Sequence, residues 1–211
     1  MSRSFLGLPA LCAAIVLATL PGCPATGVGD PCTPEQEYNS SFRAFDVKEV
    51  SVESKSFQCQ TRLCLVNHFQ GRVSCPYGQD ADGNGNGGEG CVVPGTKDKI
   101  DGKEVRTVDG KPVKGDFLDS KKKALVDAQL VDRRADLAVY CSCRCSNVDG
   151  RTDDGGNYCA CPEGFQCQQL VSSIGKGNEG LTGGYCIKNG TAYDPSKSYV
   201  NKCDRAANKC D

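Results

Sequence analysis

The sequence contains no tryptophan, one methionine and one histidine, and aromatic residues make up only 7% of the chain. Large aromatic side chains supply much of the apolar area that an ordinary core buries, so this composition does not favour a large conventional core. The only histidine, His68, is also the only side chain of the usual kind for general-base catalysis at neutral pH. We therefore expect a chain that is not an enzyme and carries no cofactor.

An excess of charge of either sign is also missing. The chain has 25 basic and 26 acidic residues, which gives a formal net charge of −1 at pH 7. Proteins that bind nucleic acid through its phosphates usually present a marked basic surplus. We therefore expect no nucleic acid partner.

No hydrophobic run is long enough to cross a bilayer comfortably. Residues 5–20 are apolar apart from Gly7, Pro9 and Thr19, whereas a transmembrane helix needs roughly 18 or more apolar residues. Arg3 precedes this run, as a basic residue does in a secretory signal. We interpret residues 1–22 as a signal peptide.

The apolar run ends at Leu20, Pro21, Gly22 and Cys23. These residues resemble the lipobox of bacterial lipoproteins, in which an aliphatic and a small residue precede a cysteine that becomes acylated. The resemblance implies cleavage after Gly22, lipidation of Cys23 and attachment to the bacterial cell envelope through the acyl chains. Two acyl chains suffice for stable membrane anchoring. Lipoproteins retained at the inner membrane often carry Asp at the next position, so Pro24 favours the outer membrane.

Cysteine, by contrast, is abundant, with 16 residues. Removal of residues 1–22 discards Cys12 and lipidation uses Cys23, which leaves an even set that can pair completely in an oxidising compartment. We expect all of these cysteines to form disulfides: Cys32, Cys59, Cys64, Cys75, Cys91, Cys141, Cys143, Cys145, Cys159, Cys161, Cys167, Cys186, Cys203 and Cys210. Five precede residue 92 and nine follow residue 140, so complete pairing requires at least one bond between the two groups.

The mature chain is therefore expected to be one cross-linked unit. Residues 23–31 form the lipidated cysteine and a tether, and residues 32–211 form the unit, which divides into a cysteine-rich part (32–91), a hairpin and helix segment (92–140) and a second cysteine-rich part (141–211). Disulfides take over part of the role of a core in such chains. We predict a small, disulfide-rich α+β fold with short strands, one helix and long glycine-rich loops.

Local patterns place several elements within this unit. Partial alternation of apolar and polar residues predicts a strand at residues 47–52, and the apolar run Leu63-Cys64-Leu65-Val66 predicts a second strand. Asp109-Gly110 predicts a hairpin with a two-residue turn. Apolar residues at near-helical spacing predict one amphipathic helix over 121–138.

One glycine-rich loop carries oxygen ligands at alternate positions, like the opening of a calcium-binding EF-hand loop. Cys91 occupies the position at which an EF-hand requires a bidentate glutamate, so a solvated loop is the main expectation. A weak calcium site is the alternative, and its ligands would be Asp80, Asp82, Asn84, Asn86 and Glu89.

The chain as a whole resembles the cysteine-rich lipoproteins of unassigned function in gram-negative bacteria. The resemblance implies a membrane-anchored structural or binding lipoprotein of the envelope, with an envelope protein or a glycan as partner. Two alternatives remain open. A labile Cys-x-Cys disulfide would suit an envelope thiol or redox enzyme, and clustered thiolates would suit a soft metal ion.

Overall fold

The computed structural model of the protein describes residues 27–80, 91–98, 100, 107–108, 111–112, 126–172 and 179–211. The predicted signal peptide, Gly22 and Cys23 lie outside the described residues. So do four of the five predicted calcium ligands, the exception being Asp80. These predictions stay predictions.

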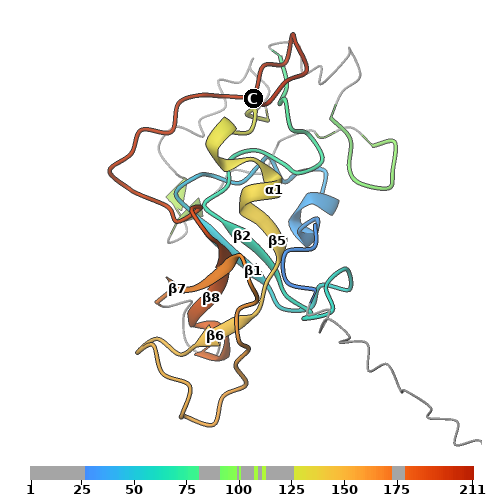
Figure 1. Cartoon of the computed structure of the whole chain (residues 1–211). Coiled ribbons are helices and arrows are strands. Elements are labelled where there is room, and N and C mark those ends of the chain that lie inside the picture. Colours follow the sequence, from blue (N-terminus) through green and yellow to red (C-terminus); the bar gives the residue numbers. More distant parts are fainter. Residues whose placement is uncertain are drawn as a thin grey trace, which may run out of the picture.

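The first sheet joins the two halves of the chain. It contains β1 (Val50–Glu53), β2 (Cys64–Asn67) and β5 (Val139–Cys141), antiparallel and in the order β1-β2-β5 (Figure 1). Both strands predicted in the first half are present, and β2, whose apolar run is continuous, is buried along its whole length. Its partner β5 comes from beyond the hairpin segment, so neither half completes this sheet alone.

The second sheet contains β6 (Arg144–Ser146), β7 (Phe165–Val171) and β8 (Gly183–Lys188), antiparallel and in the order β6-β8-β7. Figure 1 shows it directly below the first sheet. The central strand β8 begins at Gly183, which has a φ of +127°. A Cβ atom there would lie 2.1 Å from the backbone oxygen of Ser146, so only glycine permits this approach of β8 to β6.

A short hairpin stands apart from the two sheets. It pairs β3 (Thr107–Val108) with β4 (Lys111–Pro112), with Val108 opposite Lys111. Two residues therefore connect the strands, as the Asp109-Gly110 sequence predicted. The hairpin prediction is confirmed.

The prediction of one helix over 121–138 is wrong in its described part. Residues 126–130 are not helical, and helix appears only as η3 (Val131–Arg133, 3-10) and α1 (Ala135–Ala138). The reason is that distant segments use the backbone groups of 126–130: the carbonyls of Val126 and Gln129 accept hydrogen bonds from Gln79 and Cys203. Elsewhere in the described residues, the helical turns are η1 (Glu35–Tyr38) and η4 (Glu179–Leu181), both 3-10.

A core lies between the two sheets. It includes Leu65 of β2, Tyr140 of β5 and Tyr185 and Ile187 of β8, all with exposed fractions of 0–1%. Two further clusters are built around disulfides, one on Cys32, Cys59, Cys64 and Cys141 and the other on Cys75 and Cys91. The apolar core is thus divided into small parts, each adjoining cross-links.

The cysteines from Cys32 to Cys210 form seven disulfides. These are Cys32–Cys64, Cys59–Cys141, Cys75–Cys91, Cys143–Cys159, Cys145–Cys167, Cys161–Cys186 and Cys203–Cys210. Cys59–Cys141 is the bond between the two cysteine groups that their odd counts require. The described fold is disulfide-rich and strand-rich and contains little helix. The predicted short strands and disulfides are therefore present, whereas the predicted long helix is not.

Two fully buried arginines tie loops to this framework. Arg72 donates to the backbone oxygens of Glu37 and Phe42, and Arg133 donates to those of His68 and Thr191. Each guanidinium supplies several fixed donors, so one side chain satisfies carbonyls from separate loops. Segments without regular secondary structure are held in this way.

Candidate functional site

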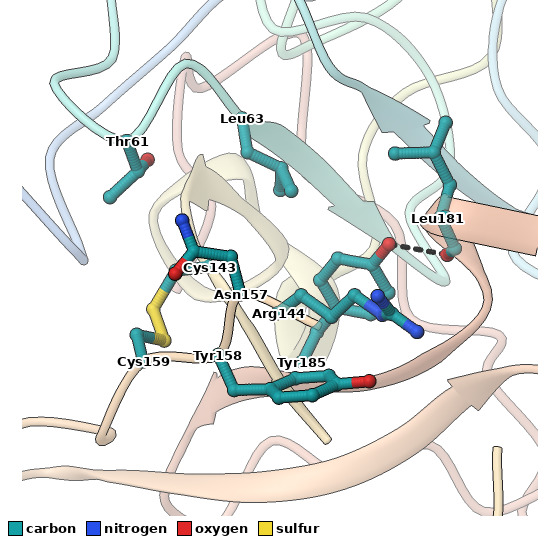
Figure 2. Close-up of a pocket in the computed structure, with 10 residues that line it drawn as sticks. Thr61, Leu63, Cys143, Arg144, Asn157, Tyr158, Cys159, Leu181 and Tyr185 are labelled. Atoms are coloured by element: carbon teal, nitrogen blue, oxygen red, sulfur yellow. Dashed lines mark hydrogen bonds between the residues drawn. A yellow bond between two sulfur atoms is a disulfide. The ribbon is translucent and has the colours of Figure 1, made fainter. Parts of the chain in front are cut away.

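A cavity of about 530 Å³ opens beside the second sheet, with the Cys143–Cys159 disulfide in its wall (Figure 2). Four parts of the chain line it: the loop before β2, the start of β6, the loop before β7, and the segment from η4 into β8. The lining residues are Thr61, Leu63, Cys143, Arg144, Asn157, Tyr158, Cys159, Gly180, Leu181 and Tyr185. The volume is within the usual range for small-molecule sites.

Arg144 is the cation of this cavity. The register of β6 and β8 places it opposite Tyr185, and its Nε donates to the backbone oxygen of Thr182 at 2.6 Å. Its guanidinium carbon lies 4.8 Å from the ring centroid of Tyr158, a cation–π contact. No carboxylate of the described residues forms an ion pair with Arg144.

Tyr158 is fixed in place by Asp154. The Tyr158 hydroxyl donates to both carboxylate oxygens of Asp154 at 2.8 Å, and Asn147 Nδ2 and the Gly156 amide donate to the same group at 3.0 Å. These hydrogen bonds, with that of Tyr158 first, lower the pKa of Asp154 to about 2, so the carboxylate is ionised at neutral pH. The Tyr158 ring therefore has a defined orientation beneath Arg144.

Tyr185 closes the inner side of the cavity. Tyr185 is fully buried, and its hydroxyl donates to the backbone oxygen of Leu181. Burial raises the pKa of Tyr185 to about 12, so the phenol stays neutral across the physiological range. Figure 2 shows Arg144 between the rings of Tyr185 and Tyr158 in this view.

The sulfur atoms behind the cavity are in contact with one another. Cys186 Sγ lies 3.7 Å from Cys143 Sγ and 3.6 Å from Cys159 Sγ, although Cys186 is bonded to Cys161. Metal binding requires thiolates, and these cysteines are disulfide-bonded. In this oxidised state the cluster offers no thiolate to a metal ion.

The residues predicted from sequence are distributed unevenly around this site. Three of the predicted disulfides lie in or behind its wall, namely Cys143–Cys159, Cys161–Cys186 and Cys145–Cys167. Asp80, the one described residue of the predicted calcium site, does not line the cavity. His68 does not line the cavity: its Nδ1 lies 3.0 Å from the Val47 oxygen and its ring stacks on Tyr193 at 3.9 Å. Burial lowers the pKa of His68, which suits a packing role.

The sequence interpretation missed Arg144, Tyr158 and Tyr185. The one available signal was the position of Arg144 between Cys143 and Cys145. In a regular strand, alternation places the middle side chain of such a triplet on the face opposite both sulfurs. Its neighbours come from a loop and from the distant strand β8, so only the three-dimensional pairing brings the three side chains together.

Comparison with known proteins gives no family. No model of a known family matches the chain, and neither a curated protein nor a solved structure resembles it significantly.

Helices of the described residues are also too short to span a membrane, the longest having four residues.

Proposed function

We propose that the chain is a membrane-anchored, disulfide-stabilised binding lipoprotein of a bacterial cell envelope, and that the Arg144 cavity takes a carboxylate-bearing glycan. The observation that carries the binding role is a positioned guanidinium in a cavity of about 530 Å³, with no carboxylate partner among the described residues. The anchor rests on the likeness of Leu20 to Cys23 to a lipobox. The proposal involves no reaction.

The chemistry of the cavity favours a carboxylate. The hydrogen bond to Thr182 uses only the Nε of Arg144. The two terminal nitrogens of a guanidinium carry four more N–H donors in a planar fork, which fits a carboxylate with two parallel hydrogen bonds. Tyr158 covers one face of the guanidinium and so limits the directions from which a ligand can approach. The binding geometry is therefore selective for a planar anionic group.

The remaining lining suits the hydroxyl groups of a sugar. The exposed side chain of Asn157 supplies both donors and an acceptor. Disulfides on β6 and β8 hold the wall before a ligand arrives. Pre-organisation of this kind reduces the entropy lost on binding.

Calorimetric titration of the oxidised protein with a galacturonate trisaccharide tests the binding role. We expect saturable binding, no binding of the matched neutral galactose trisaccharide, and a loss of about 10-fold to 100-fold in affinity in Arg144→Gln, since a charge-assisted hydrogen bond contributes about 1.5–3 kcal/mol. Arg151→Gln is the matched control, because Arg151 is exposed and pairs only with Asp149 and Asp153 in the described structure.

Two outcomes would contradict the binding proposal. Equal binding of the neutral trisaccharide would remove the role of Arg144. Binding of a peptide with a free terminal carboxylate, without binding of the galacturonate, would make the partner a protein.

The intact mass of protein extracted from membranes tests the anchor separately. We expect a mass that begins at Cys23 and includes acyl chains, with no alkylation before reduction and fourteen additions after it. A lipid-free mass would disprove the anchor and leave the cavity proposal untouched.

A further inference from the structure

The Cys143–Cys159 disulfide is accessible from the cavity, whereas neither cysteine of its neighbour, Cys161–Cys186, lines the cavity. Cys143 and Cys159 are half-buried and line the opening. Cys186, in the bond behind them, has an exposed fraction of 0%. A small thiol that enters the cavity therefore meets Cys143–Cys159 first.

The contact between these two disulfides is close enough for exchange between them. Cys186 Sγ lies at 3.7 Å from Cys143 Sγ and 3.6 Å from Cys159 Sγ, about the separation of touching sulfur atoms. Thiol–disulfide exchange proceeds by attack of a thiolate on a disulfide sulfur. Opening of the outer bond would leave a thiolate already beside such a sulfur, and a side-chain rotation would bring it into line.

The other sulfur cluster of the described structure lacks this access. It contains Cys32, Cys59 and Cys141, whose sulfurs also lie within 4.8 Å of one another. Their exposed fractions are 3%, 3% and 0%, so an external thiol cannot reach them without unfolding. Access from the cavity therefore distinguishes this cluster.

We propose that Cys143–Cys159 is a thiol-exchange site that passes the exchange to Cys161–Cys186. An external thiolate attacks Cys159 Sγ, the Cys143–Cys159 bond breaks, and Cys143 leaves as a thiolate while Cys159 holds a mixed disulfide. Cys143 then attacks Cys186 Sγ, which forms Cys143–Cys186 and releases Cys161 as a thiolate. Two disulfides and one thiolate are present before and after both steps, so no oxidant or reductant is consumed. This activity does not depend on the glycan proposed above.

Brief treatment of the oxidised full chain with 2-mercaptoethanol at neutral pH, followed by alkylation and peptide mapping without reduction, tests the pathway. We expect a mercaptoethanol adduct on Cys159, a Cys143–Cys186 linkage and alkylated Cys161, before any change at Cys59–Cys141. Alkylated Cys143 with Cys161–Cys186 intact would disprove the second step. An adduct that appears first at another disulfide would disprove the site.

Two cysteine variants complete the test. Cys159→Ser leaves Cys143 unpaired, and we expect alkylation at both Cys143 and Cys161 in the folded variant. Cys203→Ser is the control, with alkylation only at the half-buried Cys210. Alkylation only at Cys143 in Cys159→Ser would overturn the proposal.

Discussion

Arg72 and Glu37 form an ion pair in which both side chains are completely buried, with Arg72 Nε 3.8 Å from Glu37 Oε2. The Glu37 carboxylate also accepts hydrogen bonds from the amides of Val73 and Ser74 and from the Ser74 hydroxyl. The pair is therefore part of a network that joins η1 to the loop after β2. Its charges are compensated only while both partners are present.

Removal of one partner should destabilise the fold strongly. We expect Arg72→Ala to lower the free energy of unfolding by about 3–5 kcal/mol, because Glu37 would remain as an uncompensated buried charge. Urea denaturation with the disulfides intact measures the change. Arg43→Ala, which breaks a partly exposed pair with Asp127, is the control and should change it by at most about 1 kcal/mol. Equal losses in the two variants would contradict this account.

The disulfides should differ in how much they add to the free energy of unfolding, according to the length of the loop that each closes. Cys59–Cys141 spans 82 residues and Cys75–Cys91 spans 16. The chain-entropy relation gives about 4.5 kcal/mol for the first and about 3 kcal/mol for the second. Denaturation of the two double serine variants measures both values. A smaller loss for the pair at positions 59 and 141 would show that loop length does not dominate.

The orientation of Tyr158 should persist to low pH. The pKa of Asp154 is about 2 in the folded protein and 3.8 ordinarily. The contribution of the ionised carboxylate to the stability of the fold is therefore fully present above about pH 3.8 and is lost as the pH falls through about 2. Carbon-13 NMR of the Asp154 carboxyl group should give a midpoint near 2. In Tyr158→Phe the midpoint should rise towards 3.8, because the hydrogen bond that lowers the pKa of Asp154 most is gone. A wild-type midpoint near 3.8 would contradict the hydrogen-bond network.

His68 should titrate below its ordinary pKa of 6.5. Burial disfavours its charged form, with a smaller opposing effect from its hydrogen bond to Val47. Because the folded pKa is lowered, the stability associated with neutral His68 is complete above pH 6.5 and declines as the pH falls. Proton NMR titration of the imidazole measures the midpoint. Tyr193→Ala should expose the ring and move the pKa back towards 6.5, and an unchanged value would show that stacking does not bury it.

Part of this fold follows from local sequence. Partial alternation in 47–52 and the apolar run at 63–66 predicted β1 and β2, since burial of one or both faces imposes these patterns. Asp109-Gly110 predicted the hairpin because positive φ angles favour that dipeptide. These signals depend on neighbouring residues only.

The rest depends on contacts between distant residues. The apolar spacing in 121–138 predicted a helix, but hydrogen bonds to Gln79 and Cys203 hold 126–130 in another conformation. The pairing of the cysteines cannot be derived from their number, since even 8 cysteines allow 105 connectivities. The cavity could not be predicted for the same reason, because Arg144 meets Tyr158 and Tyr185 only after β6 has paired with β8.

The pairing of β2 with β5 determines when this protein can complete its first sheet. As a nascent chain emerges from its N-terminus, Cys64 follows Cys32 after 32 residues, whereas Cys141 follows Cys59 after 82. Until β5 appears, β2 has an unpaired edge and Cys59 has no correct partner. A fragment that ends before residue 139 therefore lacks the third strand of this sheet, and premature oxidation of Cys59 would give a non-native disulfide.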